Sequence, residues 1–220
     1  MTARPLRSPL ALIFDLDGVL IDSEPLHKQA KEMAFAEFGI VLSEEVYDRY
    51  KGRPDETTLR EILEERGSPE LLPELTQRKH AFFQSIEHQV QPVTGAVDFV
   101  RWAKTRFRIA LATSSTPRNR NMAFQLLGIG DQFEAVVDSS RHQRPKPDPE
   151  VFRVAMNDLR LEAAECWIIE DSLNGIVAAK AAGCVTVGIT TTFDAGKLAR
   201  AGADVVVESF AELRGVLESL

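Results

Sequence analysis

Two aspartates, Asp15 and Asp17, follow an apolar run near the start of the chain. The run, residues 10–14, contains no polar residue, which is typical of a buried strand rather than a half-exposed one. Side chains two apart on a strand share a face, so Asp15 and Asp17 can point into one site. Gly18 then lets the backbone leave the strand in a conformation that most residues resist. Two carboxylates in such a place repel each other and lose hydration, so we expect a cation beside them.

Other polar residues follow later apolar segments or lie in a loop between prolines: Thr113 with Ser114, Lys146, and Glu170 with Asp171. Each has a plain structural explanation when taken alone. A Thr-Ser-Ser turn is typical of a helix cap, a lysine between prolines of a solvated loop, and Glu-Asp-Ser of an acidic helix start. Their joint placement after apolar strands favours a shared site instead.

The residue types in this set favour phosphoryl transfer assisted by a hard divalent cation. Converging carboxylates without a His or Cys cluster fit Mg²⁺ better than zinc. Lys146 adds positive charge, and Thr113 and Ser114 add hydroxyls just before a predicted helix N-terminus, which is a natural anion site. Together they form a cradle for a phosphoryl group, in which Asp15 can attack phosphorus and Asp17 can shuttle the proton.

The elements that must position these residues alternate between strand and helix. The pattern predicts strands over residues 10–14, 107–112, 135–137, 166–169, 185–189 and 205–207. It predicts helices over residues 96–105, 117–127, 149–159 and 174–182, and one from residue 210. Such alternation predicts an α/β fold with a Rossmann-like, doubly wound parallel sheet, and ligands bind such sheets at the carboxyl ends of the strands.

Residues 21–91 show helical spacing and no convincing strand. One helix begins near Pro25 and ends at Gly39, and further helices run through Leu63 and up to Ile86. The sequence therefore predicts an inserted all-helical cap domain, residues 21–91, and an α/β catalytic core made of residues 1–20 and 92–220.

Composition excludes several other classes of protein. The 220 residues carry a formal net charge of −7, so no global basic field attracts nucleic acid or an anionic membrane. The two cysteines, Cys166 and Cys184, form no zinc-like or CxxC pattern and are expected to be reduced core residues. No run has the length of a signal peptide or a transmembrane helix, so a cytoplasmic location is the default expectation. Nothing in the sequence demands more than a monomer.

Four motifs together resemble the haloacid dehalogenase superfamily. They are the run FDLDGVLIDS at residues 14–23, Thr113, Lys146-Pro147, and IEDS at residues 169–172. The likeness is closer to the branch of phosphatases and beta-phosphoglucomutase that carries a helical cap after the first motif. It covers essentially the whole chain.

This resemblance implies a role for each matching residue. Asp15 would be the nucleophile that forms a phosphoaspartate, Asp17 the general acid/base, and Thr113 and Lys146 phosphate ligands. Asp17 and the acidic pair Glu170-Asp171 are residues that the metal-free dehalogenases of the family do not need, which favours phosphoryl transfer over carbon–halogen cleavage. The Mg²⁺ ligands that the resemblance implies are Asp15, the backbone carbonyl of Asp17, and Asp171 with Glu170 beside it.

Residues of the predicted cap indicate which class of substrate the protein binds. His27, Lys51-Gly52 and Lys79 match cap positions of the mutase, but the mutase has an arginine three places after the glycine to grip a distal phosphate. This chain has Asp55 there, and Arg53 one place after Gly52. The substrate-binding candidates in the cap are therefore His27, Arg53 and Lys79.

The missing arginine favours a phosphoric monoester hydrolase that acts on a small phosphorylated metabolite, such as a sugar phosphate. A sugar phosphomutase similar to beta-phosphoglucomutase is the alternative. A third hypothesis, a non-catalytic phosphate sensor, has no support from the motifs, because no catalytic position is substituted.

Overall fold

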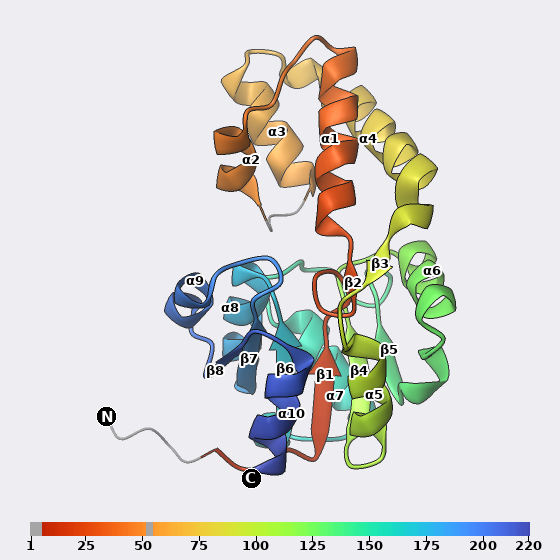
Figure 1. Ribbon diagram of the computed structural model, residues 1–220. Helices are drawn as coiled ribbons and strands as arrows, with labels where there is room; N and C mark the ends of the chain where they lie inside the picture. The colour runs from red at the N-terminus through yellow and green to blue at the C-terminus, as the bar shows by residue number, and fades with distance from the viewer. Residues whose placement is uncertain (1–5, 52–54) are drawn as a thin grey trace. The chain divides into compact units, whose positions relative to one another are not determined.

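The computed structural model describes residues 6–51 and 55–220, which form two compact units (Figure 1). Unit 1 combines the first strand with everything from residue 92 onward, and unit 2 spans residues 23–91. The chain leaves and rejoins unit 1 through two short strands that pair, β2 (Ile21–Asp22) and β3 (Gln91–Pro92). This pair was not predicted from the sequence.

Unit 1 is built on a six-stranded parallel sheet with the strand order β5-β4-β1-β6-β7-β8. Its strands are β1 (Ala11–Phe14), β4 (Arg108–Ala112), β5 (Ala135–Val137), β6 (Cys166–Glu170), β7 (Val185–Ile189) and β8 (Val205–Val207). The central strand β1 pairs with β4 on one side and β6 on the other, so that Phe14 lies opposite Leu111 and Ile169. The predicted α/β fold with a doubly wound parallel sheet is confirmed.

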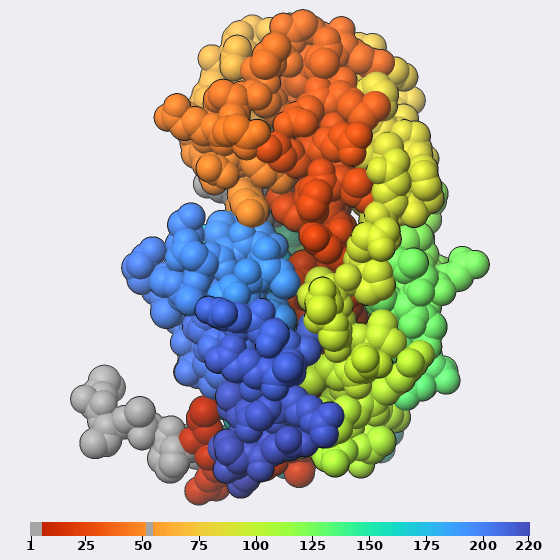
Figure 2. All heavy atoms as spheres, viewed as in Figure 1, coloured from red at the N-terminus to blue at the C-terminus, as the bar shows by residue number. Residues whose placement is uncertain are grey.

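Helices cover both faces of this sheet (Figure 1). They are α5 (Ala96–Lys104), α6 (Pro117–Leu127), α7 (Glu150–Leu159), α8 (Leu173–Ala182), α9 (Ala195–Ala201) and α10 (Phe210–Glu218). Ala11 and Ile13 of β1 face the apolar cluster that α7 and α8 complete. On the other face Phe14 meets Phe99 of α5, with ring centroids 6.0 Å apart, and Phe99 in turn contacts Phe210 of α10. Figure 2 shows α10, in dark blue, beside α5 on this face.

Side-chain caps stabilise the N-termini of α6 and α8, the helices that follow β4 and β6. Thr116 accepts a hydrogen bond from the backbone N–H of Asn119 at the start of α6. Ser172 does the same for Gly175 at the start of α8, at 3.0 Å. Such caps satisfy backbone donors that the first helical turn leaves open, so each loop after β4 and β6 is held where its strand ends.

Unit 2 consists of helices around an apolar core of its own. They are α1 (Glu24–Glu37), α2 (Glu44–Tyr50), α3 (Asp55–Glu65) and α4 (Leu72–Ile86). Phe35, Leu59 and Leu75 are fully buried in this core. Helices α1 and α4 lie side by side (Figure 1). Short 3-10 turns complete the described structure at Pro69–Leu71, Glu87–Gln89, Gly130–Gln132 and Ala163–Glu165.

Within residues 6–51 and 55–220, every helix is too short or too polar to cross a lipid bilayer.

Candidate active site

The carboxyl ends of β1, β4 and β6 bring together the residues that the sequence analysis expected to meet. Asp15 directly follows β1, Thr113 directly follows β4, and Glu170 is the last residue of β6. The backbone N–H of Asp15 donates to the carbonyl of Ile169 at 3.1 Å, and that of Thr113 to the carbonyl of Val137 at 2.9 Å. The parallel pairing thus continues to the residues that carry the polar side chains.

Lys146 joins two of these strand ends through its side chain. Its Nζ donates to Oδ1 of Asp15 at 2.8 Å and to Oε1 of Glu170 at 2.5 Å. Burial lowers the pKa of Lys146, but the carboxylates of Asp15 and Glu170 outweigh this effect and hold the pKa above its usual range. Lys146 is therefore a buried, charged lysine, and the solvated-loop explanation does not hold for it.

Three buried carboxylates beside this lysine form a group that can hold a metal ion. Ligand oxygens of Asp15, Glu170 and Asp171 all lie within 4.8 Å of one another. Burial raises the pKa of Asp15 to about 7, and the nearby carboxylates add to the rise while Lys146 opposes it. Burial and the charges of Glu170 and Asp15 likewise raise the pKa of Asp171 well above its usual value. One ammonium group does not balance three carboxylates, and an all-oxygen donor set fits a hard divalent cation.

Glu170 accepts hydrogen bonds through both oxygens of its carboxylate. Its Oε1 accepts from Lys146, and its Oε2 accepts from the backbone N–H groups of Asp171 and Ser172, both at 3.2 Å. The Ser172 hydroxyl donates to the same oxygen at 3.0 Å. The side chain is fully buried. Glu170 therefore links the loop after β6 to Lys146 as well as lying among the possible metal ligands.

Asp17 lies on the same edge of the sheet but outside that carboxylate group. Its Oδ2 accepts a hydrogen bond from the hydroxyl of Ser115, and the backbone N–H of Ser115 donates to Oγ1 of Thr113 at 3.0 Å. Thr113 is buried and Ser114 is exposed. Thr113 and Ser114 were predicted site residues, whereas Ser115 was not predicted to be one. Its place two residues after Thr113, in the same loop, was the available signal.

In unit 2 a second charged cluster gathers around Asp55. Lys79 forms an ion pair with Asp55 and lies 2.9 Å from Nδ1 of His27. Lys31 lies 3.0 Å from the other oxygen of Asp55. Both lysines are buried, and the His27 ring stacks on Phe83 with centroids 4.2 Å apart. Burial raises the pKa of Asp55, but Lys31, Lys79 and His27 outweigh this effect and lower it overall.

The structure thus brings together two of the three cap candidates, His27 and Lys79. The third, Arg53, lies outside the described residues. Lys31 was missed by the sequence analysis, although its position four residues after His27 places both on one face of α1.

We expect Asp55→Asn to destabilise unit 2 strongly, because it removes the negative charge that Asp55 places against two buried lysines. A buried ion pair that loses one member costs on the order of 3 kcal/mol. The pKa of Asp55 is held below the ordinary value of 3.8, so this stabilisation is complete above that pH and declines as the pH falls further. Urea unfolding of the full chain, with hydrogen exchange of the α1 and α4 amides, measures the loss.

Glu44→Gln is the matched control for Asp55→Asn. Glu44 also pairs with a lysine of α1, Lys28, at 2.5 Å, but its side chain is 77% exposed. Exposed pairs contribute little because water and salt screen them, so the amides should keep their protection. Equal effects of the two substitutions would contradict a structural role for the Asp55 cluster.

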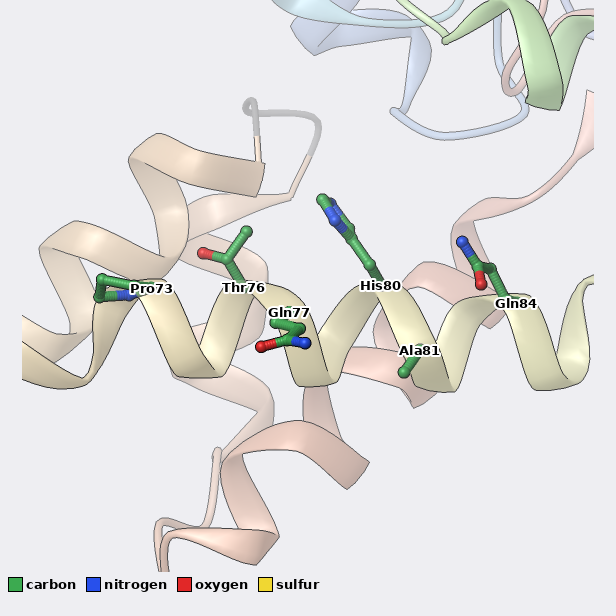
Figure 3. Close-up of a pocket in the computed structure, with 6 residues that line it drawn as sticks. All are labelled: Pro73, Thr76, Gln77, His80, Ala81 and Gln84. Atoms are coloured by element: carbon green, nitrogen blue, oxygen red, sulfur yellow. The ribbon is translucent and has the colours of Figure 1, made fainter.

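A separate hollow runs along α4 (Figure 3). Its lining consists of Pro73, Thr76, Gln77, His80, Ala81 and Gln84. All of them come from one helix, and His80 is the only titratable residue among them. The hollow therefore lacks the carboxylates and lysines of the two clusters described above.

Comparison with known proteins places this chain in a family. Residues 12–189 match the family model for haloacid dehalogenase-like hydrolases. The chain is 30% identical over 204 residues to the phosphorylated carbohydrates phosphatase of Thermotoga maritima, which covers 90% of this chain and 94% of that protein. It is 32% identical over 212 residues to the beta-phosphoglucomutase of Bacillus subtilis, with 92% and 91% covered.

A solved structure agrees with these sequence matches. The crystal structure of a hydrolase from Pseudomonas syringae superposes with a TM-score of 0.83 at 26% identity, and the match covers 96% of this chain and 98% of that one. The resemblance drawn from the four motifs is confirmed, and the phosphatase-named relative is consistent with a phosphoric monoester hydrolase. The chain belongs to the family of haloacid dehalogenase-like hydrolases.

Proposed function

We propose that this hydrolase is a Mg²⁺-dependent phosphatase that cleaves a small phosphorylated metabolite through a phosphoaspartate. The observation that carries the proposal is the buried chain of contacts from Asp15 through Lys146 to Glu170, with Asp171 close by. A buried carboxylate held by a lysine among possible metal ligands is suited to attack an anionic phosphoryl group. The name of the Thermotoga maritima relative supports a sugar phosphate as the substrate class.

Asp15 and Asp17 divide the chemistry. An oxygen of Asp15 attacks phosphorus, the bond to the ester oxygen breaks, and Asp17 gives that oxygen its proton. Asp17 then takes a proton from water, whose oxygen bonds to phosphorus as the bond to Asp15 breaks and inorganic phosphate leaves. Lys146 fixes the Asp15 carboxylate through Oδ1, and the Ser115 hydroxyl fixes that of Asp17.

The phosphoryl oxygens are bound by residues that the loops supply. Thr113, Ser114 and Lys146 are the proposed ligands, and the loop from Thr113 leads into the N-terminus of α6, whose helix dipole favours a nearby anion. The proposed Mg²⁺ ligands are Asp15, the backbone carbonyl of Asp17, and Asp171 with Glu170 beside it. A bound ion would offset the charge of Asp15 and draw electron density from a phosphoryl oxygen.

The rest of the substrate is assigned to His27, Lys79 and Arg53 of the predicted cap. Asp55, which stands where the mutase has an arginine, pairs with Lys31 and Lys79. Asp55 cannot supply the guanidinium that would grip a second phosphate, and it engages both lysines in ion pairs, which supports a hydrolase of monophosphates over a mutase that must hold a bisphosphate.

A phosphate-release screen over sugar phosphates, nucleotides and glycolytic acids tests this function. We expect release from at least one sugar phosphate in the presence of Mg²⁺, loss of release with EDTA, and recovery when Mg²⁺ is restored. In a parallel assay with beta-glucose 1-phosphate and a bisphosphate activator, glucose 6-phosphate that forms faster than free phosphate would favour the mutase. Tight phosphate binding without hydrolysis of any ester would favour the sensor.

A further inference from the structure

Gly175, in the first turn of α8, has no backbone reason to be a glycine. It lies within a regular helix and does not have a positive φ angle. A glycine inside a helix costs roughly 1 kcal/mol relative to alanine, because it loses more conformational freedom on folding. Something other than the backbone must account for a buried glycine at this position.

The Glu170 carboxylate fills the place where a side chain of residue 175 would be. A Cβ atom on Gly175 would lie 1.9 Å from the carboxyl carbon of Glu170 and within 2.1 Å of both its oxygens. Neither oxygen is free to move away, since one accepts from Lys146 and the other from the loop at Ser172. The first turn of α8 is also where a negative charge is stabilised by the helix dipole.

Displacement of the Glu170 carboxylate would therefore also shift Lys146, which contacts the carboxylate of Asp15, the proposed nucleophile. Glu170 and Asp15 hold the Lys146 ammonium between them, at 2.5 and 2.8 Å. We propose that Gly175 is a positioning residue: its missing side chain lets the Glu170 carboxylate dock on α8 and hold Lys146 against Asp15. The inference rests on the proposed function for its catalytic consequence, but the placement of Lys146 can be measured independently.

Another glycine shows why Gly175 is the informative position. A Cβ on Gly18 would come within 1.9 Å of Asp171, but Gly18 also has a φ of +73°, so its replacement would strain the backbone as well. Gly215, in the middle of α10, has nothing within 4 Å of an added Cβ. Gly215→Ala is therefore a matched helical control without a neighbour to displace.

The test compares Gly175→Ala with Gly215→Ala in full-length protein. We expect Gly175→Ala to lower kcat by about ten- to a hundredfold, the range that a misplacement near 1 Å can produce, with a smaller change in KM. Gly215→Ala should leave kcat unchanged. In a Glu170→Asp background the shorter side chain withdraws from residue 175, so adding Gly175→Ala should cost less than about twofold. An equal cost in both backgrounds would overturn the proposal, because damage to the helix alone does not depend on residue 170.

Lysine labelling followed by mass spectrometry gives a readout that needs no substrate. Gly175→Ala should raise the labelling rate of Lys146 several-fold, while Lys180, an exposed lysine on the same helix, should keep its rate in every variant. A raised Lys146 rate in a protein that hydrolyses no phosphate ester would support the positioning role and refute the proposed function. Unchanged Lys146 labelling in Gly175→Ala would refute the positioning role whatever the activity.

Discussion

Asp15→Asn should abolish phosphate release and leave the chain folded. An amide oxygen is a poor nucleophile and cannot form the phosphoaspartate, so we expect a loss of about 10⁴-fold or more. Asparagine has nearly the shape of aspartate, and Lys146 keeps Glu170 as its partner. Turnover with a saturating sugar phosphate measures the loss. Asp131→Asn, which changes an exposed aspartate of unit 1, should be fully active.

The same substitution should make the metal-free protein more resistant to unfolding at alkaline pH. Burial raises the pKa of Asp15 from 3.8 to about 7, so the folded state disfavours its ionised form. The stability that this group contributes is complete below pH 3.8 and is lost as the pH rises through about 7. Asparagine cannot ionise, and the variant should escape this loss. Thermal unfolding in EDTA on both sides of pH 7 tests the sign.

A folded Asp15→Asn variant with full turnover would exclude Asp15 as the nucleophile. A variant that unfolds at a lower temperature than the wild type at pH 8 in EDTA would instead contradict the electrostatic account of the site. The two readouts are therefore separate tests of chemistry and of burial.

The site in unit 1 could be anticipated because its strands are apolar along their length. In β1 and β6 the first polar side chains appear at or directly after the strand end, and parallel strands in one sheet share that edge. The spacing of residues along the sequence does not predict which side chains contact one another at this edge. The hydrogen bond from Ser115 to Asp17 joins residues 98 apart, and the Lys31–Asp55 pair depends on how α1 and α3 pack.

The elements that were missed are those too short to leave a pattern. Strands β2 and β3 have two residues each, and alternation is not visible over such a length. Helix α9 buries only Leu198 among its seven residues, and Gly196 lies in its first turn. Asp194 at its N-cap and Gly202 at its end were the remaining signals. They mark the two ends of a segment that has no apolar stripe.

Lys146→Met should reduce both activity and stability. Methionine keeps most of the length of lysine but leaves Asp15 and Glu170 as buried carboxylates without their common cation. The loss of one member of a buried ion pair costs about 3–5 kcal/mol, and the loss of a charge beside a transferring phosphoryl group costs about 10²–10³-fold in kcat. Lys180→Met removes the cation of a partly exposed pair with Asp204 and should change neither quantity much.

A second substitution separates the two effects of Lys146→Met. Glu170→Gln in the same chain removes one of the two carboxylates that Lys146→Met leaves without a cation. The double variant should therefore recover part of the lost stability. It should not recover activity, because the cation beside Asp15 and the phosphoryl group is still missing. Urea unfolding and phosphate release on the four proteins of the cycle measure both quantities. Recovery of activity together with stability would mean that Lys146 only holds the fold, and its role as a phosphate ligand would have to be abandoned.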